Sequence, residues 1–522
     1  MPRSQHYKAY RPSPFPREER DRVTILFGGV TWKHERLAGA ALRNLGYRVE
    51  SLPNPTRRDF ETGKELVDPG ACCPTYFTAG CLANALREKV AREGRDAVAR
   101  NYVFVTASGC GACRFGQYLE SYALALEGIG LPDLRIFRLE QDQLSAKSTR
   151  GQGLDINASF MLGALWACMI ADLLGELEHQ ARPYEVREGE TQSALEHSIE
   201  HLERAFLERP HRPGQAATIL WYLTSGHFER ALRDIAPQWA ALELDRLRVK
   251  PKVKITGEMW VKTHEGEGNY NIKRWLEQEG AEAIPMSMAF WVDYMLSFRL
   301  MRFNEAREAI RLARLKQRPV RLTRALLRRA YERLRHALLD LAEPWPDQDE
   351  LARLAQPFYS DRLNGGEAYL LIGEALHAHR EKLAHMVCEL APYGCMPSTM
   401  SVGAMANVLG HYPDLLYAPI ELKGDAEIHA LSRCQMILTE AKRRAQQEFD
   451  RALCETQLSL EAIREWEVRN PQARRFGTVL PHAATVGTAA RYVRYVGEMV
   501  KRKDGRPAGS ATPALANLEA AR

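Results

Sequence analysis

The 522-residue chain lacks any long run of apolar residues. Its uncharged, mostly apolar stretch at residues 156–171 is shorter than the roughly 20 apolar residues that a membrane helix requires. The first 20 residues carry charges and prolines and have no apolar core of the kind found in secretory signals. We therefore expect a cytoplasmic protein without a membrane segment, in which residues 156–171 belong to a buried helix.

The chain also has little net charge and lacks several catalytic motifs. It holds 72 Lys and Arg residues against 66 Asp and Glu residues, and a net charge of +6 over this length is too small to indicate a nucleic-acid-binding protein by itself. No Gly-x-x-x-x-Gly-Lys-Ser/Thr loop, His-Glu-x-x-His pair or Gly-x-Ser-x-Gly elbow occurs, so P-loop ATPase, zinc protease and α/β-hydrolase assignments have no support. If ATP takes part in the function, we expect it to act through another chain.

The chain does contain a regular alternation of strand-like and helix-like segments. Hydrophobic residues make up 45% and charged residues 26%, which is ordinary for a folded protein, and the length suffices for two to four domains of roughly 100–200 residues. Short apolar runs of the strand type lie at residues 23–27, 48–52, 102–106, 134–139, 253–260, 283–286, 386–390 and 415–419. Because helical patterns separate them, these runs predict parallel β-α-β units. We expect an α/β fold with two Rossmann-like parallel-sheet domains, a helical connection, a helical insert and a helical C-terminal tail.

Changes in composition along the chain predict five segments. We expect an extended arm at residues 1–20, a first α/β domain with clustered cysteines at residues 21–155 and a helical connection at residues 156–250. A second α/β domain with an Arg-rich helical insert should follow at residues 251–455, and a helical extension with a disordered tail at residues 456–522. Within the first α/β domain, we expect residues 53–70 to form a loop that leads to the first cysteines.

Cysteine is the residue type whose distribution is most informative. Of the ten cysteines, five lie within 42 residues and one follows a Pro-Tyr-Gly turn far downstream, namely Cys72, Cys73, Cys81, Cys110, Cys113 and Cys395. A cytosolic protein keeps its thiols reduced, so clustered cysteines indicate metal binding or redox chemistry rather than disulfides.

Four of these cysteines share one predicted location. Each of them follows a predicted strand or its loop and precedes a helix: Cys72, Cys110, Cys113 and Cys395. In open parallel sheets ligands bind at the carboxyl ends of the strands, so the four thiols would meet in one crevice if the two domains face each other. The positive end of a helix also favours the thiolate that zinc or an iron–sulfur cluster requires. The pattern therefore predicts that these four cysteines are metal ligands.

Other assignments remain open on the residues alone. A structural zinc site usually takes two close Cys-x-x-Cys pairs, and only Cys110 and Cys113 form one here. A thiol–disulfide redox protein would use the same pair, which leaves Cys395 without a role. A non-catalytic interaction subunit with unused cysteines is the third alternative. The role of Cys73 is open, and we expect core positions for Cys81, Cys168, Cys388, Cys434 and Cys454.

Two cysteine motifs resemble those of a known family. Gly-Ala-Cys-Cys-Pro at residues 70–74, and above all Cys-Gly-Ala-Cys-Arg-Phe-Gly-Gln-Tyr at residues 110–118, resemble signatures of the acyl-CoA dehydratase activase large region. That region belongs with the superfamily of 2-hydroxyacyl-CoA dehydratases, benzoyl-CoA reductases and double-cubane cluster proteins. Shorter matches follow in order at residues 182–185, 256–258, 268–271, 365–367 and 392–397, so the resemblance covers most of the chain.

The resemblance implies two Rossmann-like domains that hold an iron–sulfur cluster, either 4Fe–4S or a double-cubane 8Fe–9S, between them. It implies Cys72, Cys110, Cys113 and Cys395 as the cluster ligands. It also implies a separate ATPase activator of the actin and sugar-kinase fold as electron donor, an acyl-CoA or another small molecule as substrate, and a homo- or hetero-oligomer. A double cubane would take about six thiolates, so Cys73 or Cys388 would have to join.

Two further features have a functional and a structural interpretation. Residues 311–335 contain ten Arg or Lys residues and one acid, and we expect an amphipathic helix with Arg321, Arg324, Arg328 and Arg335 on a solvated stripe. The alternative is a docking surface for an acidic partner or a phosphate group; nucleic acid is the weakest candidate, because aromatic residues are sparse there. For Glu258, just past a predicted strand, we expect a structural hydrogen bond, with an acid–base role as the alternative.

Overall fold

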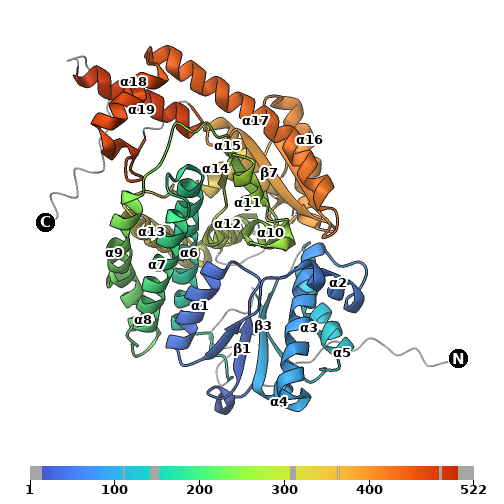
Figure 1. Ribbon diagram of the computed structural model, residues 1–522. Helices are drawn as coiled ribbons and strands as arrows, with labels where there is room; N and C mark the ends of the chain where they lie inside the picture. The colour runs from blue at the N-terminus through green and yellow to red at the C-terminus, as the bar shows by residue number, and fades with distance from the viewer. Residues whose placement is uncertain are drawn as a thin grey trace.

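The computed structural model of the chain describes residues 15–109, 112–140, 152–305, 313–360, 362–363, 365–480 and 485–503. It contains two four-stranded parallel sheets, one in the blue N-terminal lobe and one in the orange lobe above it, with a layer of helices beside them (Figure 1). The prediction of an α/β fold with two Rossmann-like parallel sheets is confirmed. Most of the predicted disordered tail lies outside the described residues, and so does most of the predicted N-terminal arm.

The first lobe is built on a sheet of order β2-β1-β3-β4. Its strands are β1 (Thr24–Phe27), β2 (Arg48–Ser51), β3 (Tyr102–Ser108) and β4 (Arg135–Glu140). Ile25 in β1 pairs with Val49 on one side and Val103 on the other, and Ile25 and Val103 are almost fully buried, as expected for central parallel strands. The helices are α1 (Trp32–Asn44), α2 (Arg57–Leu66), α3 (Cys73–Glu93), α4 (Arg95–Asn101) and α5 (Tyr118–Gly128), the last preceded by a short 3-10 helix, η2 (Arg114–Gln117).

The second lobe repeats the same sheet order, as β6-β5-β7-β8. Its strands are β5 (Lys252–Gly257), β6 (Glu282–Ile284), β7 (Met386–Pro392) and β8 (Leu416–Leu422). The helices around it are α10 (Met259–Thr263), α11 (Ile272–Gln278), α15 (Ala368–Arg380), α16 (Met396–His411) and α17 (Glu427–Thr456). Because the two orders match, the carboxyl end of β7 in this lobe corresponds to the carboxyl end of β3 in the first.

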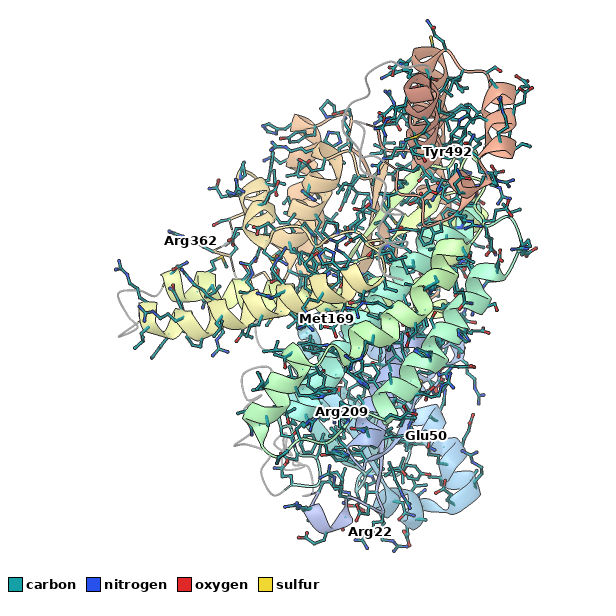
Figure 2. All side chains as sticks on the ribbon, turned by 90° about the vertical axis from the view of Figure 1, so that its left-hand side faces the viewer. Arg22, Glu50, Met169, Arg209, Arg362 and Tyr492 are labelled. Atoms are coloured by element: carbon teal, nitrogen blue, oxygen red, sulfur yellow. The ribbon has the colours of Figure 1, made fainter. Side chains whose placement is uncertain are left out.

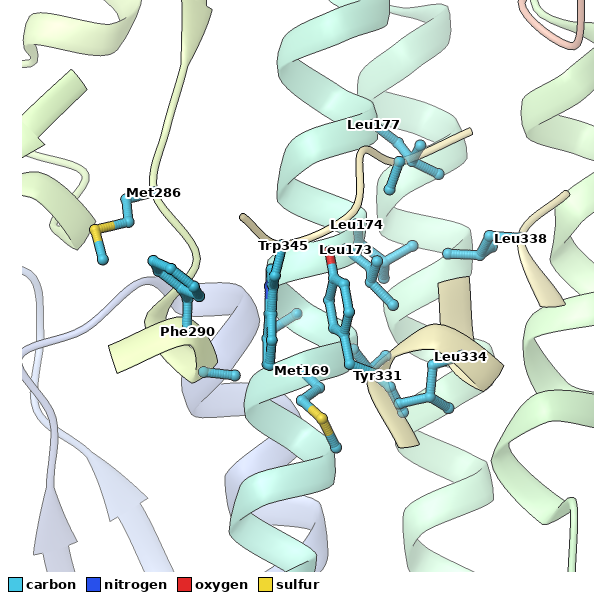
Figure 3. Packing of buried hydrophobic residues seen from close by; sticks show 14 of the residues in the cluster. Met169, Leu173, Leu174, Leu177, Met286, Phe290, Tyr331, Leu334, Leu338 and Trp345 are labelled. Atoms are coloured by element: carbon cyan, nitrogen blue, oxygen red, sulfur yellow. The ribbon is translucent and has the colours of Figure 1, made fainter. Parts of the chain in front are cut away.

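A helical layer connects the lobes. It consists of α6 (Ala158–Ala181), α7 (Glu190–Leu207), α8 (Gln215–Thr224) and α9 (His227–Ala241). Helix α6 is long and apolar enough to cross a membrane by length and composition, but most of its apolar window is buried. Leu173 and Leu174 in α6 pack towards Tyr331 and Trp345, whose rings stack at 3.9 Å (Figure 3). Helix α6 is therefore a largely buried core helix, as predicted for residues 156–171.

The insert of the second lobe is a helical hairpin that projects from the body (Figure 2). Its helices are α12 (Met288–Glu305) and α13 (Ala313–Ala337), followed by α14 (Gln348–Ala355). The solvated arginine stripe predicted on α13 is wrong in large part. Arg324 and Arg328 bind the fully buried Asp293 at 3.0 and 2.7 Å, and Arg335 binds Glu332 at 2.9 Å. The periodicity of α13 did not reveal the pairs of Arg324 and Arg328, because their acidic partner Asp293 comes from another helix.

Two boundaries differ from expectation. Residues 53–70 are not a loop throughout, because α2 begins at a capping box in which Thr56 and Asp59 satisfy each other's backbone N–H groups. The strand predicted over residues 253–260 ends at Gly257, whose φ of +118° turns the chain so that Glu258 caps α10. The chain continues into α18 (Leu460–Arg469) and α19 (Thr488–Lys503), and short 3-10 helices lie at Arg17–Glu19, Arg182–Tyr184, Glu267–Asn269 and Pro471–Arg474.

Candidate functional site

The carboxyl ends of the two sheets meet at a seam between the lobes. The backbone N–H of Cys73 donates to the carbonyl of Tyr393 at 3.0 Å. The rings of Phe77 and Trp260 lie 5.8 Å apart across the same boundary. The seam is therefore closed by direct contacts between the first turn of α3 and the loops that follow β5 and β7.

Cys72 lies at this seam as the N-cap residue of α3. Its side chain is buried, and its sulfur is 3.2 Å from the hydroxyl of Thr75 and 3.2 Å from the hydroxyl of Tyr118. Pro74 in the first turn fits this position because the free N–H groups of a helix start need no partner within the helix. The thiol of Cys72 is thus surrounded by hydrogen-bonding groups, although it is hidden from water.

Cys395 is likewise the N-cap residue of its helix, α16. It is buried, and the hydroxyl and backbone N–H of Ser398 lie against its sulfur, where both lower the pKa of the thiol. The sequences around the two N-caps follow one pattern, Cys-x-Pro-Thr at residues 72–75 and Cys-x-Pro-Ser at residues 395–398. This repeated pattern is a signal in the sequence that the motif analysis missed, and it identifies Thr75 and Ser398 as partners of the two sulfurs.

Cys113 reaches the seam from the loop that follows β3. It caps η2, and its sulfur accepts the N–H of Phe115 at 3.4 Å. The next residue, Arg114, donates to the carbonyl of Gly70, just before the Cys72 turn. Cys110, the fourth predicted ligand, lies outside the described residues.

The structure brings Cys72, Cys113 and Cys395 together from three distant segments. The contact is tightest at Gly394, directly before Cys395. A side chain added there would lie 3.3 Å from the Cα of Cys72 and 3.2 Å from Nη1 of Arg114, directly after Cys113. The charges of neighbouring thiols also act on one another, since ionised Cys72 raises the pKa of Cys113 and ionised Cys113 raises that of Cys395.

Burial dominates the acidity of these thiols. It raises the pKa of Cys113 to about 12 and also raises those of Cys72 and Cys395, although N–H and hydroxyl donors act in the opposite direction. Without a bound cation the three sulfurs are therefore neutral thiols at neutral pH. A reactive redox thiol needs a lowered pKa, which favours the thiolate. A metal ion, in contrast, displaces the proton of a thiol when it binds.

The spacing of the thiols also bears on the kind of metal. The described part of the chain contains two groups of three His, Cys, Asp or Glu residues whose ligand atoms all lie within 4.8 Å of one another inside the group. Neither group contains Cys72, Cys113 or Cys395. A tetrahedral zinc ion with Zn–S bonds of about 2.3 Å would bring its sulfurs to about 3.8 Å from each other. The three described thiols are thus more widely spaced than a compact zinc site requires.

The two compact groups are satisfied by protein partners instead. In the group His34, Cys168 and Asp172, the aspartate accepts the backbone N–H groups of Met288 and Ala289 at 2.9 and 2.7 Å and so caps α12. In the group Glu178, His179 and Glu265, the ammonium of Lys33 lies 2.7 Å from both glutamates. Lys33 therefore already supplies the positive charge that a cation would bring.

The remaining cysteines divide between core and surface. Cys73, Cys81, Cys388 and Cys434 are buried, and Cys388 and Cys434 contact each other inside the second lobe. Cys168 is partly buried against the helical core. The prediction of a core position is wrong for Cys454, which is exposed because it lies in the last turn of α17 on its solvent face.

Two carboxylates complete the seam. Glu258 accepts the backbone N–H groups of Trp260 and Val261, both at 3.1 Å, so the predicted structural hydrogen bond is confirmed. Burial and the nearby charge of Glu367 raise the pKa of Glu258 to about 7. Glu367 precedes α15, in the crossover between β6 and β7, whereas Cys72 precedes α3 in the crossover between β2 and β3. Equivalent crossovers thus present a thiol in one lobe and a carboxylate in the other.

Comparison of the sequence with models of known protein families gives no match, and comparison with curated proteins gives none either. The function must therefore be argued from the site itself.

Proposed function

We propose that the chain is an iron–sulfur protein that receives low-potential electrons from a separate ATP-hydrolysing activator and passes them to a difficult reduction or to an acyl-CoA dehydration. The observation that carries this proposal is the convergence of Cys72, Cys113 and Cys395 at one buried seam. Thiols from three separate segments offer one ligand set to a common centre, and the backbone N–H groups of Thr75 and Ser398 at two helix N-termini favour the ionised form of Cys72 and Cys395.

Cys72, Cys113 and Cys395 would hold the cluster together with Cys110. When bound, the cluster supplies a one-electron store at the seam. A 4Fe–4S cluster needs no further thiolate. For a double cubane, Cys73 is the better additional ligand, because Cys388 is fully buried in the core of the second lobe beside Cys434.

The surrounding residues of this chain orient the ligands and exclude water. Tyr118 and Thr75 hold the sulfur of Cys72, Ser398 lies against Cys395, and the N–H of Phe115 faces Cys113. Hydrogen bonds to cluster sulfurs stabilise the reduced state and raise the reduction potential. These groups would therefore set the potential at which the chain accepts an electron.

Electron entry requires a partner that can approach the seam. Tyr393 and Met396 flank Cys395 and are 56% and 44% exposed, so the buried sulfur lies directly beneath accessible side chains. We propose a cytoplasmic ATPase of the actin and sugar-kinase fold as the donor, an acyl-CoA or another small molecule as acceptor, and a homo- or hetero-oligomeric assembly.

Anaerobic purification followed by iron, sulfide and zinc analysis and EPR of the reduced protein tests the proposal. We expect a brown protein with about four or eight iron atoms per chain and a similar number of acid-labile sulfide ions. Cys113→Ser and Cys395→Ser should each lower the iron content. The matched control is Cys454→Ser, which removes an exposed cysteine remote from the seam and should leave iron unchanged.

Each other outcome supports a different assignment. Zinc in place of iron, or a titratable disulfide that depends on Cys113 but not on Cys395, would support a zinc or thiol–disulfide protein that uses Cys110 and Cys113. A colourless, metal-free and thiol-inert chain would support a non-catalytic interaction subunit. Equal iron in all three serine variants would refute the shared site.

A further inference from the structure

Behind the seam, the second lobe buries more negative than positive charge. Glu367, Glu374 and Glu389 are 8%, 3% and 1% exposed, and the cations near them are the ammonium groups of Lys262 and Lys254. The Nζ of Lys262 is fully buried, lies 3.9 Å from Oε2 of Glu367 and makes no hydrogen bond within the described chain. Two lysines do not offset three buried carboxylates, and burial favours the protonated form of Glu374 and Glu389.

Glu389 is the best-defined member of the group. It lies in β7, where the hydroxyl of Tyr417 in β8 donates to Oε2 at 2.7 Å and the hydroxyl of Ser401 in α16 donates to Oε1. Burial raises the pKa of Glu389 to about 7, although both hydroxyl donors favour the ionised form. Burial also raises the pKa of Glu374, whose Oε2 has no hydrogen-bond partner within the described chain.

A short series of contacts connects Glu389 with the cysteine site. The hydroxyl oxygen of Ser401, which contacts Glu389, also lies 3.0 Å from the carbonyl oxygen of Ser398, and its one proton serves one of these two acceptors at a time. Ser398 in turn lies against the sulfur of Cys395. Glu389 is thus nearly two turns of α16 away from that sulfur. The charge of Glu367 acts on both Cys113 and Glu389, so the thiol site and Glu389 share one electrostatic neighbourhood that water does not screen.

Other charged and titratable groups also face Glu389. Lys262 from α10, Glu367 from the α15 segment and Tyr417 from β8 act on Glu389, and Lys254 from β5 acts on the neighbouring Glu374. Helix α16 contributes the neutral Ser401. The positive groups favour the ionised form of Glu389, and the acidic groups favour its protonated form. The protonation equilibrium of Glu389 is therefore sensitive to one further charge.

We propose that Glu389 is a redox-linked proton site, which takes up a proton from solvent when an electron reaches the centre at the seam. This inference rests on the proposed function, and it assigns Glu389 a positioning role rather than contact with substrate. The electron comes from the low-potential donor, the proton comes from water, and the O–H bond forms on the carboxylate of Glu389. The proton offsets the negative charge that reduction adds to a buried site. Reoxidation breaks the same O–H bond and returns the proton to water.

The first test uses the full chain without iron, so its result does not depend on whether the protein binds a cluster. Infrared spectra in H₂O and D₂O report the carbonyl stretch of un-ionised carboxyl groups. We expect a deuterium-sensitive band that titrates through the neutral range and that Glu389→Gln diminishes. The matched control is Glu440→Gln, because hydrogen bonds from Arg443 and Arg444 lower the pKa of the exposed Glu440 to about 2 and leave it ionised. No loss of the band in Glu389→Gln would overturn the inference.

The second test uses the iron-loaded protein and measures its midpoint potential by EPR-monitored titration at several pH values. We expect the potential to fall with rising pH across the neutral range by up to about 59 mV per pH unit, the equivalent of a tenfold change in proton concentration. Glu389→Gln should flatten this slope, and Glu440→Gln should not.

The two tests separate the two proposals. A titrating carboxyl band in a chain that binds no iron would refute the proposed function and leave Glu389 as a buried proton site without a redox link. An iron-loaded protein whose potential has the same pH slope in the wild type and in Glu389→Gln would refute the redox-linked proton site alone.

Discussion

The hydroxyl of Tyr118 lies 3.2 Å from the sulfur of Cys72. This contact joins the first turn of α5 to the first turn of α3, and it connects the last residue of the Cys110–Tyr118 motif with the other cysteine motif of the first lobe. The buried tyrosine has the Cys72 sulfur and the Thr75 hydroxyl as neighbours, and burial raises its pKa well above the ordinary value. Tyr118 is therefore a hydrogen-bond donor at neutral pH.

Replacing this donor tests its influence on the centre. Tyr118→Phe removes one hydrogen bond of about 1 kcal/mol to a cluster sulfur and should lower the midpoint potential by about 40–50 mV at unchanged iron content. EPR-monitored redox titration measures the shift. Tyr122→Phe is the control, since Tyr122 lies one turn further along α5 and donates to Thr78 at 3.1 Å instead. Equal potentials in the two variants would show that Tyr118 does not tune the centre.

The close approach at Gly394 predicts a second effect. Gly394 has a φ of +79°, and a Cβ there would crowd Cys72 and Arg114, so Gly394→Ala should destabilise the protein by about 2 kcal/mol and lower its iron content. Gly46→Ala is matched for backbone strain, because Gly46 has a φ of +83° and no atom within 4 Å of the added Cβ. It should cost about 1 kcal/mol at full iron content. Urea unfolding and iron analysis distinguish the two, and full iron in Gly394→Ala would contradict the packing of the seam.

The buried carboxyl of Glu389 should make stability depend on pH. Its folded-state pKa of about 7 lies above the ordinary 4.5, so its contribution is complete below pH 4.5 and is lost as pH rises through 7. The loss for this group is of order 3 kcal/mol. Glu389→Gln does not titrate and should therefore lose less stability between about pH 5 and pH 8 in urea unfolding of the iron-free chain. The exposed Glu440→Gln should leave the pH dependence as it is, and a similar flattening in that variant would contradict the assignment.

The projecting hairpin depends on one buried acid. Asp293→Asn would leave Arg324 and Arg328 without their shared counter-charge, and we expect a loss of about 3 kcal/mol and faster proteolysis of α12 and α13. Asp349→Asn removes another partner of Arg324, 3.7 Å away but 75% exposed, and should cost under about 1 kcal/mol. Urea unfolding measures both, and equal losses would show that burial of Asp293 is unimportant.

Local patterns in the sequence predicted much of the fold. The apolar runs at residues 102–106 and 386–390 are central strands, because buried parallel strands need continuous apolar side chains whatever surrounds them. The same patterns missed α2, whose polar sequence begins at the Thr56 cap, and they placed Cys454 in the core. Helical periodicity shows which residues share a face, but it does not show which face another element covers.

The sequence by itself determined where the thiols stand along the chain, after strands and at helix starts, since strand and cap preferences are local. Only the tertiary structure decided that Cys72, Cys113 and Cys395 lie at one seam, that the hydroxyl of Tyr118 contacts the sulfur of Cys72, and that Glu389 is buried behind them. The reason is physical: the free energy of burying a thiol or a carboxyl depends on every group that folding brings near it, and those groups come from residues hundreds of positions apart.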